Sequence, residues 1–261
     1  KDIGMTALWL NPVLENNMPE YSYHGYAMTD LYKVDARYGS NEEYQQLSSR
    51  AKQMGIGIIM DQVANHIGSY HPWIANLPSG DWLNQWEEFT PTNHMKVSRF
   101  DPHSAAIDQK VFHDGWFVST MPDLNQRQPK LAKYLIQNSI WWIEYADLYG
   151  IRMDTWSYPD KQFLADWTKG ILTEYPNFNI VGEEWVSDPS LISYWQSNVI
   201  RGDDYDSYLP SIMDFPLQSA VTEGLKGETA WRSSMVKIYE SLANDYMYGN
   251  LNNIMIFPDN H

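Results

Sequence analysis

The chain has 261 residues, enough for one large domain or two small ones with a substantial core. Its formal net charge of -15 argues against binding to nucleic acids or anionic membranes, because both need basic patches that contact phosphate. The lack of cysteine excludes disulfides and thiolate chemistry, and no apolar run approaches the ~18 residues that a membrane helix needs.

Short apolar runs alternate with longer amphipathic stretches, as expected of successive βα units in a parallel sheet. In chain order, the predicted strands are Thr6–Leu10, Gly57–Asp61, Ile151–Asp154, Asn179–Gly182, Leu209–Met213 and Asn253–Phe257. The predicted helices are Asn41–Met54, Gln128–Leu148, Asp160–Tyr175 and Trp231–Asn244. The chain starts with Lys1, inside what looks like the end of a helix that leads into a strand, so we expect it to be a piece of a longer protein.

The segment from Ile67 to about Gln126 has little periodicity and is rich in Trp, Pro, Asn, His and Asp. This composition predicts a long irregular insertion after the second predicted strand. Insertions of this length commonly carry function or form a small subdomain.

Each predicted strand ends in polar residues, among them Asp61, Asp154 and Glu183. In a parallel α/β barrel the carboxyl ends of all strands open on one face, where active sites collect. Loops are generally polar, so a single acid after one strand needs no functional explanation. Acids after several strands in succession are harder to explain in this way. We therefore expect these acids to converge in space.

The stretch GIRMDTWSYPD places Arg152 and Asp154 at alternate positions of one predicted strand. Strand side chains alternate between faces, so these two share a face, and the guanidinium can hydrogen-bond the carboxylate and favour its ionised form. An isolated pair of this kind is most often a structural ion pair. An ionised carboxylate also suits a nucleophile.

Three further motifs follow predicted strands: DQVANH from Asp61 to His66, VGEEW from Val181 to Trp185, and FPDNH at the end of the chain. With the arginine and aspartate motif, they resemble in order the four conserved regions of the α-amylase superfamily of glycoside hydrolases. GMTALWLNPV is similar to the second barrel strand of that family, and SYHGYAMTDLYKVDARYGS to the loop that follows it. MPDLN and SIMDFPL resemble the neopullulanase, cyclomaltodextrinase and intermediate amylase groups.

The resemblance implies an α/β fold, a TIM (β/α)8 barrel that is incomplete in this chain and holds about strands 2 to 7. Residues 1–66 would form the first part of the barrel, and residues 67–126 an irregular inserted domain after strand 3. Residues 127–261 would form the second part, cut before the end of the barrel.

The same resemblance implies that Asp154 is the nucleophile, Glu183 the general acid/base and Arg152 their charged neighbour. A retaining glycosidase needs two carboxyls about 5 to 5.5 Å apart, one ionised and one protonated. The neighbouring Glu184 would point to the opposite face of the strand, so only one of the two glutamates can enter the site. The family's third carboxylate is expected directly after His261, beyond the supplied sequence.

Other roles also rest on the resemblance. His66 and His261 match histidines that bind the sugar at the cleavage point, His24 lies near them, and Tyr26 matches a ring that stacks on that sugar. Tyr158 stands where many α-amylases have Lys or His and is expected beyond the cleavage point. Asp61 would support the site from behind. The remaining histidines are expected to be surface or packing residues: His71, His94, His103 and His113.

The resemblance implies that the chemistry needs no cofactor. Asn65 matches a calcium ligand of the calcium-dependent family members, and Asp123 is a weaker candidate for a second ligand. Calcium takes six to eight oxygen ligands, so these two residues alone cannot complete a site.

These observations predict a retaining hydrolase of α-1,4-glucosidic bonds in starch-derived oligosaccharides, with α-1,6 bonds, cyclodextrins or pullulan as further substrates. Two alternatives stay open: a 4-α-glucanotransferase on the same site, and an inactive sugar-binding relative. A nucleotide enzyme lacks support because the sequence has no Gly-rich phosphate loop. A glucan substrate suggests a protein exported from the cytoplasm. The oligomeric state stays open.

Overall fold

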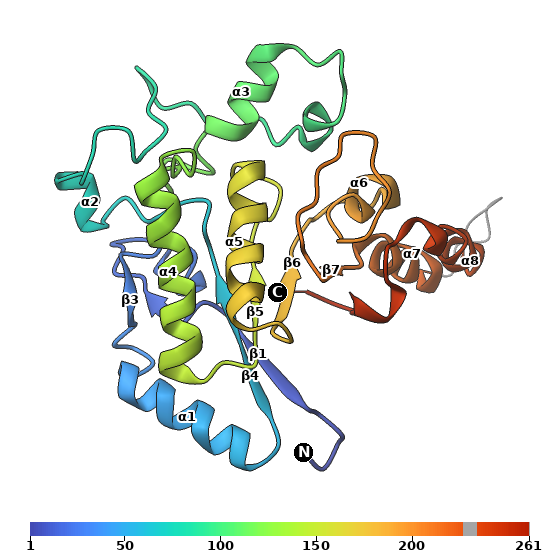
Figure 1. The fold of residues 1–261 in the computed structure, drawn as a ribbon, viewed down its shortest axis with the longest axis horizontal. Helices are drawn as coiled ribbons and strands as arrows, with labels where there is room; N and C mark the ends of the chain where they lie inside the picture. The colour runs from blue at the N-terminus through green and yellow to red at the C-terminus, as the bar shows by residue number, and fades with distance from the viewer. Residues whose placement is uncertain (227–233, 261) are drawn as a thin grey trace.

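The structure is a computed structural model that describes residues 1–226 and 234–260. Its centre is a six-stranded sheet in which neighbouring strands are parallel, in the order β1-β4-β5-β6-β7-β8 (Figure 1). These strands are β1 (Ala7–Leu10), β4 (Gly57–Gln62), β5 (Gly150–Met153), β6 (Asn179–Gly182), β7 (Ser211–Met213) and β8 (Ile254–Met255).

The six predicted strands are all present, and only their ends differ. The largest difference is at β8, which contains only Ile254 and Met255 of the predicted Asn253–Phe257. Strand β7 starts at Ser211, two residues later than predicted, and Leu209 instead forms an isolated bridge with Gln196. The central strand β5 is buried along its whole length, as expected for a parallel strand with both faces covered.

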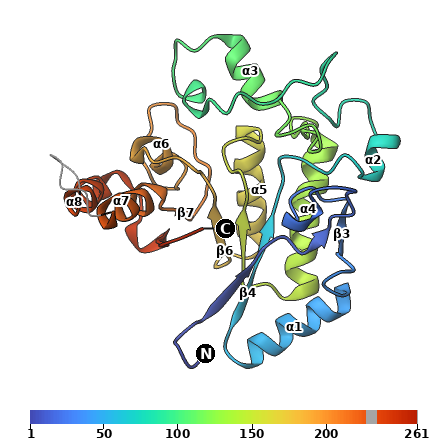
Figure 2. The same cartoon turned by 180° about the vertical axis from the view of Figure 1, so that it is seen from behind.

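Helices connect successive strands, and α1, α4 and α5 lie along one face of the sheet in both views (Figures 1 and 2). The α-helices are α1 (Asn41–Gln53), α2 (Pro72–Ala75), α3 (Ala106–Asp114), α4 (Pro129–Ala146), α5 (Lys161–Glu174), α6 (Pro189–Ser193), α7 (Phe215–Leu225) and α8 (Val236–Leu242). The 3-10 turns are η1 (Ser22–His24), η2 (Lys96–Arg99), η3 (Asp245–Met247) and η4 (Leu251–Asn253). The start of α1 is fixed by a capping box of Ser40 and Glu43.

Two helical predictions need correction after β7. The helix predicted from Trp231 to Asn244 is α-helical only over Val236–Leu242 among the described residues, and residues 231–233 lie outside them. Helix α7 was not predicted, although its start signal is in the sequence: Asp214 accepts a hydrogen bond from the Leu217 N–H, and a proline stands in the first turn.

The stretch predicted as a loop after the first strand contains a small second sheet. Strand β2 (Leu14–Glu15) pairs antiparallel with β3 (Asp30–Val34), and their register shifts at an irregularity. The intervening turn carries His24 and brings it back towards the end of β1. This pairing was missed because β2 has only two residues.

The segment between β4 and α4 has little regular structure, as predicted. It contains α2, η2 and α3, and it lies over the carboxyl ends of the sheet strands (Figure 1). Its exact limits as a separate domain stay a prediction.

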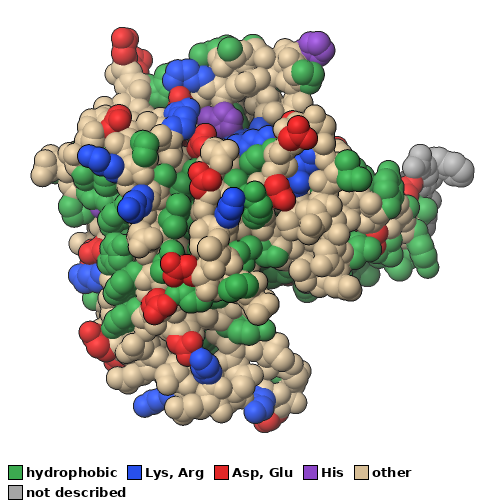
Figure 3. Space-filling model, viewed as in Figure 1, with side chains coloured by type: hydrophobic (Ala, Val, Ile, Leu, Met, Phe, Trp, Pro, Cys, Tyr) green, Lys and Arg blue, Asp and Glu red, His purple; other side chains and the backbone are tan. Residues whose placement is uncertain are grey.

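The core lies between the sheet and its helices. Four of its largest side chains are fully buried tryptophans: Trp142, Trp156, Trp167 and Trp195. On the outside, hydrophobic side chains gather over α7 and α8, among them Leu225 and Tyr239 (Figure 3). Within the described ranges, every helix is too short or too polar to cross a bilayer.

Candidate active site

The predicted acids lie side by side because their strands are neighbours in register. Asp61 in β4 pairs with Arg152 in β5, and Met153 pairs with Gly182 in β6. Asp154 and Glu183 each follow directly after these paired positions. The parallel sheet thus brings together residues that are far apart in the sequence.

Arg152 joins the three acids. Its Nη1 donates to Asp154 Oδ1 at 2.7 Å and to Asp61 Oδ1 at 2.9 Å. Its Nη2 lies 3.5 Å from Glu183 Oε2. The arginine is only 1% exposed, so these carboxylates are the charges that compensate a buried guanidinium.

Glu183 is held by the backbone that follows β5. The Thr155 N–H donates to Glu183 Oε2 at 2.8 Å. Thr155 has a φ of 47°, a strained conformation for a β-branched residue, and this left-handed turn aims its N–H at the carboxyl. Burial and the Asp154 carboxylate raise the pKa of Glu183 above its usual value, although Arg152 acts in the opposite direction.

Asp61 lies behind the site, where the sequence predicted a supporting residue. Its Oδ2 accepts hydrogen bonds from Trp9 Nε1 at 3.0 Å and from the Tyr26 hydroxyl at 3.2 Å. The residue is 1% exposed, and burial raises its pKa despite the nearby Arg152. Asp61 therefore braces both Arg152 and the Tyr26 ring.

A cavity of about 530 Å³ opens over this cluster. Arg152, Asp154 and Glu183 line it together with the predicted sugar-binding residues His24, Tyr26 and His66. The rest of its wall is mostly apolar and includes Phe117 and Met121 from the inserted segment and Trp185 from the end of β6. A cavity with apolar walls and a few converging polar groups is typical of a small-molecule site.

His66 is neutral and already has partners within the protein. Its Nε2 donates to the Tyr26 carbonyl at 3.1 Å, and its Nδ1 accepts from the Asn65 amide at 3.3 Å. Burial lowers its pKa to about 4. His66 thus lines the cavity with its ring. A sugar hydroxyl that accepts a hydrogen bond from His66 Nε2 would have to share that N–H with the Tyr26 carbonyl. His24 is less buried, and its Nδ1 accepts from the Tyr26 N–H at 2.9 Å.

A second cavity of about 460 Å³ adjoins the first and is also lined by Glu183. It shares Phe117, Thr155, Glu183 and Trp185 with the first cavity. Tyr158 lines it, and its hydroxyl contacts His94 Nδ1 at 2.9 Å. His94 packs against Phe117 and Tyr158, as expected of a packing residue, and it also lines this cavity.

The family model described as "Alpha amylase, catalytic domain" matches residues 1–247. The chain belongs to the alpha-amylase family. It is 29% identical over 240 residues to Alpha-amylase 3 of Dictyoglomus thermophilum, covering 87% of this chain and 43% of that protein. It is 30% identical over 230 residues to a cyclomaltodextrinase of Thermoanaerobacter pseudethanolicus, covering 85% of this chain and 35% of that one. The chain thus spans less than half the length of these curated relatives.

A solved alpha-amylase confirms the predicted fold class. The alpha-amylase from Geobacillus thermoleovorans, complexed with acarbose, is similar with a TM-score of 0.79 and 30% identity. The match covers all of this chain and 52% of that one. The six parallel strands are therefore part of an alpha-amylase (β/α)8 barrel.

Several residues of the candidate site were not selected from the sequence. Trp185 stands in the VGEEW motif, but no role was predicted for it. Phe117 and Lys96 belong to the irregular insertion, where no periodicity indicates which side chains turn inward. His261, predicted to bind the sugar, lies outside the described residues.

The two candidate calcium ligands are neighbours. His66 and Asp123 form an isolated antiparallel bridge, and the Leu124 N–H donates to the Asn65 carbonyl at 2.9 Å. The Asn65 Oδ1 is buried and has no hydrogen-bond partner among the described residues. Asp123 is 1% exposed and accepts from Asn84 Nδ2 at 2.7 Å.

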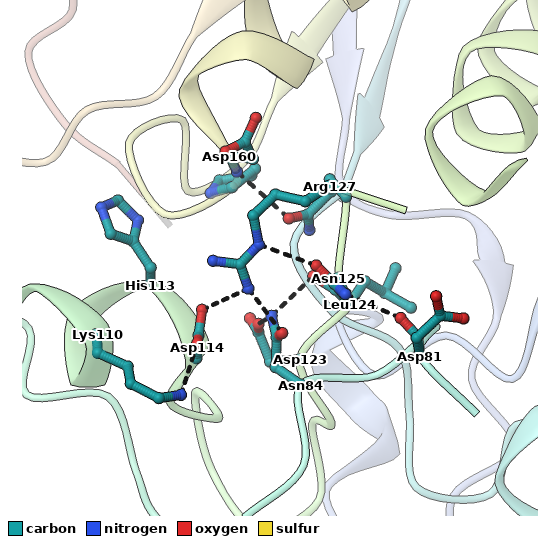
Figure 4. A network of polar contacts seen from close by, with 12 residues as sticks. Asp81, Asn84, Lys110, His113, Asp114, Asp123, Leu124, Asn125, Arg127 and Asp160 are labelled. Atoms are coloured by element: carbon teal, nitrogen blue, oxygen red, sulfur yellow. Dashed lines mark hydrogen bonds and ion pairs between the residues drawn. The ribbon is translucent and has the colours of Figure 1, made fainter. Parts of the chain in front are cut away.

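Figure 4 shows the network beside Asp123, in which Arg127 reaches between Asn84 and Asp114. Burial raises the pKa of Asp123 well above its usual value. Across residues 1–226 and 234–260, no cluster of three acidic or histidine side chains forms a ready metal site. A cation here would therefore depend on Asn65, Asp123, backbone carbonyls and water.

Proposed function

We propose that this chain forms the catalytic centre of a retaining glycoside hydrolase that cleaves α-1,4-glucosidic bonds in starch-derived oligosaccharides. Bonds of the α-1,6 type, cyclodextrins and pullulan are further substrates within the proposal. The names of the relatives, alpha-amylase and cyclomaltodextrinase, support an α-glucan as the substrate class.

In the first step, a carboxylate oxygen of Asp154 bonds to the anomeric carbon while the bond from that carbon to the leaving oxygen breaks. Glu183 gives its proton to the leaving oxygen. In the second step, water passes a proton to Glu183, and its oxygen displaces Asp154 from the anomeric carbon. The sugar leaves with its original anomeric configuration because it has been displaced twice.

The observation that carries the proposal is the unequal environment of the two carboxyls at one cavity. Arg152 bonds Asp154 at 2.7 Å but lies 3.5 Å from Glu183. This short, charge-assisted hydrogen bond holds the Asp154 carboxylate in place, as suits a nucleophile. Burial favours the protonated form of Glu183, as a general acid requires.

Transfer to a second sugar is the closest alternative. The second cavity offers room for a leaving or accepting sugar. An accepting sugar hydroxyl would take the place of water in the second step, with the same residues in the same roles. The ratio of transfer to hydrolysis is therefore an outcome of the test.

Calcium is a separate part of the proposal. Asn65 Oδ1 and the Asp123 carboxylate would hold the ion, and it would supply a structural link between the end of the insertion and the end of β4. The unpartnered Asn65 oxygen and the buried Asp123 carboxyl support this assignment, since calcium prefers oxygen ligands.

The test uses the full-length protein with maltoheptaose, β-cyclodextrin, pullulan and α-maltosyl fluoride. Asp154→Asn should lose turnover of all of them. Glu183→Gln should lose maltoheptaose cleavage but still release fluoride, which leaves without a proton, in a burst accompanied by a covalent adduct on Asp154 detected by mass spectrometry. If wild type cleaves none of the substrates yet binds maltoheptaose, the inactive sugar-binding alternative holds instead.

A further inference from the structure

A second glutamate lies next to Glu183 and faces away from the first cavity. Glu184 is fully buried, and neither of its carboxylate oxygens has a hydrogen-bond partner among the described residues. Its ion-pair partner is Lys96, whose Nζ lies 3.4 Å from Glu184 Oε1. A buried carboxylate requires compensation of this kind, because an uncompensated buried charge is strongly destabilising.

Lys96 begins the short turn η2 of the inserted segment, and Arg99 ends it. Side chains at such positions of a 3-10 turn eclipse each other, so the turn presents two cations on one side. Burial lowers the pKa of Arg99 to about 10, and the Glu184 charge opposes that effect. One turn of the insertion thus carries the ion-pair partner of Glu184, Lys96, and a second cation, Arg99, whose charge interacts with the same buried acid.

Lys96 also contacts the backbone that carries the predicted acid/base. Its Nζ donates to the Trp185 carbonyl at 3.1 Å, so it contacts the two residues that follow Glu183. The side chain is 13% exposed and lines the second cavity together with Glu183. The ammonium group lies 5.3 Å from the centre of the Tyr158 ring. It therefore sits at the border between the insertion, the strand end and the cavity.

We propose that Lys96 is a positioning residue for Glu183: its ammonium group fastens the η2 turn to the strand end from Glu183 to Trp185 and places a positive charge beside the proton-donating carboxyl. This inference rests on the proposed function, since it assigns a role within that reaction. If Lys96 has this role, the inserted segment contributes a residue that acts on the proposed acid/base, in addition to forming part of the cavity wall.

The charges that face Glu183 come from two parts of the chain. Asp154 and Arg152 belong to β5 and its end, and Lys96 comes from the insertion. Tyr158, in the turn after β5, lines the same cavity without a charge, because burial raises its pKa. Asp154 raises the pKa of Glu183, while Arg152 and Lys96 lower it. Lys96 thus limits how firmly Glu183 holds the proton that it must give up in the first step.

The experiment measures kcat/KM against pH for maltoheptaose with the full-length wild type, Lys96→Gln, Lys96→Met and Lys96→Arg. The alkaline limb reports deprotonation of Glu183. Lys96→Gln and Lys96→Met remove the positive charge of Lys96, so in both variants the alkaline limb of the pH profile should move to higher pH by about half a unit. Lys96→Arg should keep it in place. Lys96→Met, which also loses the contact to the Trp185 carbonyl, should show a further fall in kcat of about tenfold.

A matched control is Lys110→Met, which removes another lysine of the insertion from an ion pair, that with Asp114 at 2.9 Å, away from both cavities. In this variant, the alkaline limb of the pH profile should lie at the same pH as in wild type. A limb that stays in place in both neutral Lys96 variants would overturn the inference while leaving the proposed function intact. No cleavage by wild type would instead overturn the proposed function.

A readout without catalysis covers variants that have lost activity. The carboxyl ¹³C signal of Glu183, identified by its loss in Glu183→Gln, can be titrated in wild type and in Lys96→Gln. A midpoint raised by about half a unit in the variant supports the inference, and equal midpoints contradict it.

Discussion

Arg152 is the residue on which the geometry of the site depends. One buried guanidinium contacts Asp61, Asp154 and Glu183, and each contact comes from a different place in the sequence. Because the three buried acids share a single cation, they cannot all be ionised at low cost. The site therefore separates two chemically similar acids, Asp154 and Glu183, into different proposed roles.

The raised pKa of Glu183 predicts the pH dependence of the reaction. The acid must be protonated to assist the leaving oxygen, so kcat/KM should fall as pH rises through the raised value. A profile measured from pH 4 to pH 10 should keep full activity well above pH 5, beyond the range of an ordinary glutamate, whose pKa is about 4.3. An alkaline limb near pH 4 to 5 would contradict the assignment of Glu183 as the acid.

The same shift predicts a stability effect in Glu183→Gln. Between the usual and the raised pKa, the unfolded chain has released this proton while the folded protein still holds it, so wild-type stability falls as pH rises. Glutamine binds no such proton. In this pH window, the free energy of unfolding of the variant should therefore rise relative to that of wild type by about 1.4 kcal/mol per pH unit. Thermal unfolding at pH 4.5, 6 and 7.5 measures the difference in Tm. A difference that is the same at all three values would argue against the shift.

At the end of β6, a glycine allows the close packing that positions Glu183. A Cβ atom on Gly182 would lie 2.8 Å from a Leu209 methyl and 2.9 Å from the Trp156 ring, both of which are fully buried. Glycine thus lets β6 approach its neighbours closely, directly before Glu183. The strand end and the carboxyl that it carries are fixed by packing as well as by hydrogen bonds.

Gly182→Ala should therefore destabilise the protein by about 1 to 3 kcal/mol and lower kcat, because Trp156 and Leu209 must move. Urea unfolding and maltoheptaose kinetics measure both effects. The matched control is Gly170→Ala inside α5, where the nearest atom would be a methyl of Ile136 at 3.4 Å. There alanine should be neutral or stabilise the helix by up to about 1 kcal/mol. Equal effects of the two changes would show that packing at Gly182 is not critical.

For the whole molecule, the inserted segment contacts the barrel strands at sites that include the ends of β4 and β6. Its η2 turn meets the end of β6 through Lys96 and Glu184, and its last part meets the end of β4 through the bridge of Asp123 and His66. Both contacts lie at the carboxyl edge of the sheet. The insertion therefore closes the site from above and supplies part of its wall.

The proposed calcium site predicts a dependence of stability on the metal. Adding calcium to chelator-treated protein should raise Tm, because an ion that binds only the folded state stabilises it. Asp123→Asn should abolish the rise, whereas Asp101→Asn, which changes an exposed aspartate of the same segment, should retain it. If Tm is the same with calcium and with chelator in wild type, the site does not hold calcium.

The sequence alone determined the order of the strands and the identity of the central acids. Apolar runs of strand length mark β1, β4, β5 and β6, and the resemblance to the α-amylase superfamily selected Asp61, Asp154 and Glu183 among the acids at the strand ends. A parallel sheet then requires that residues at successive strand ends meet. The short strand β2 was missed because two residues are too few to show a pattern of apolar and polar positions.

Only the tertiary structure decided which side chains complete the site. Lys96 and His94 reach the second cavity because the insertion folds back over the sheet, and its path depends on contacts between segments that are far apart in the chain. An irregular segment has no period from which inward-facing positions can be predicted. The left-handed turn at Thr155 and the full burial of Glu184 are likewise imposed by packing against distant residues.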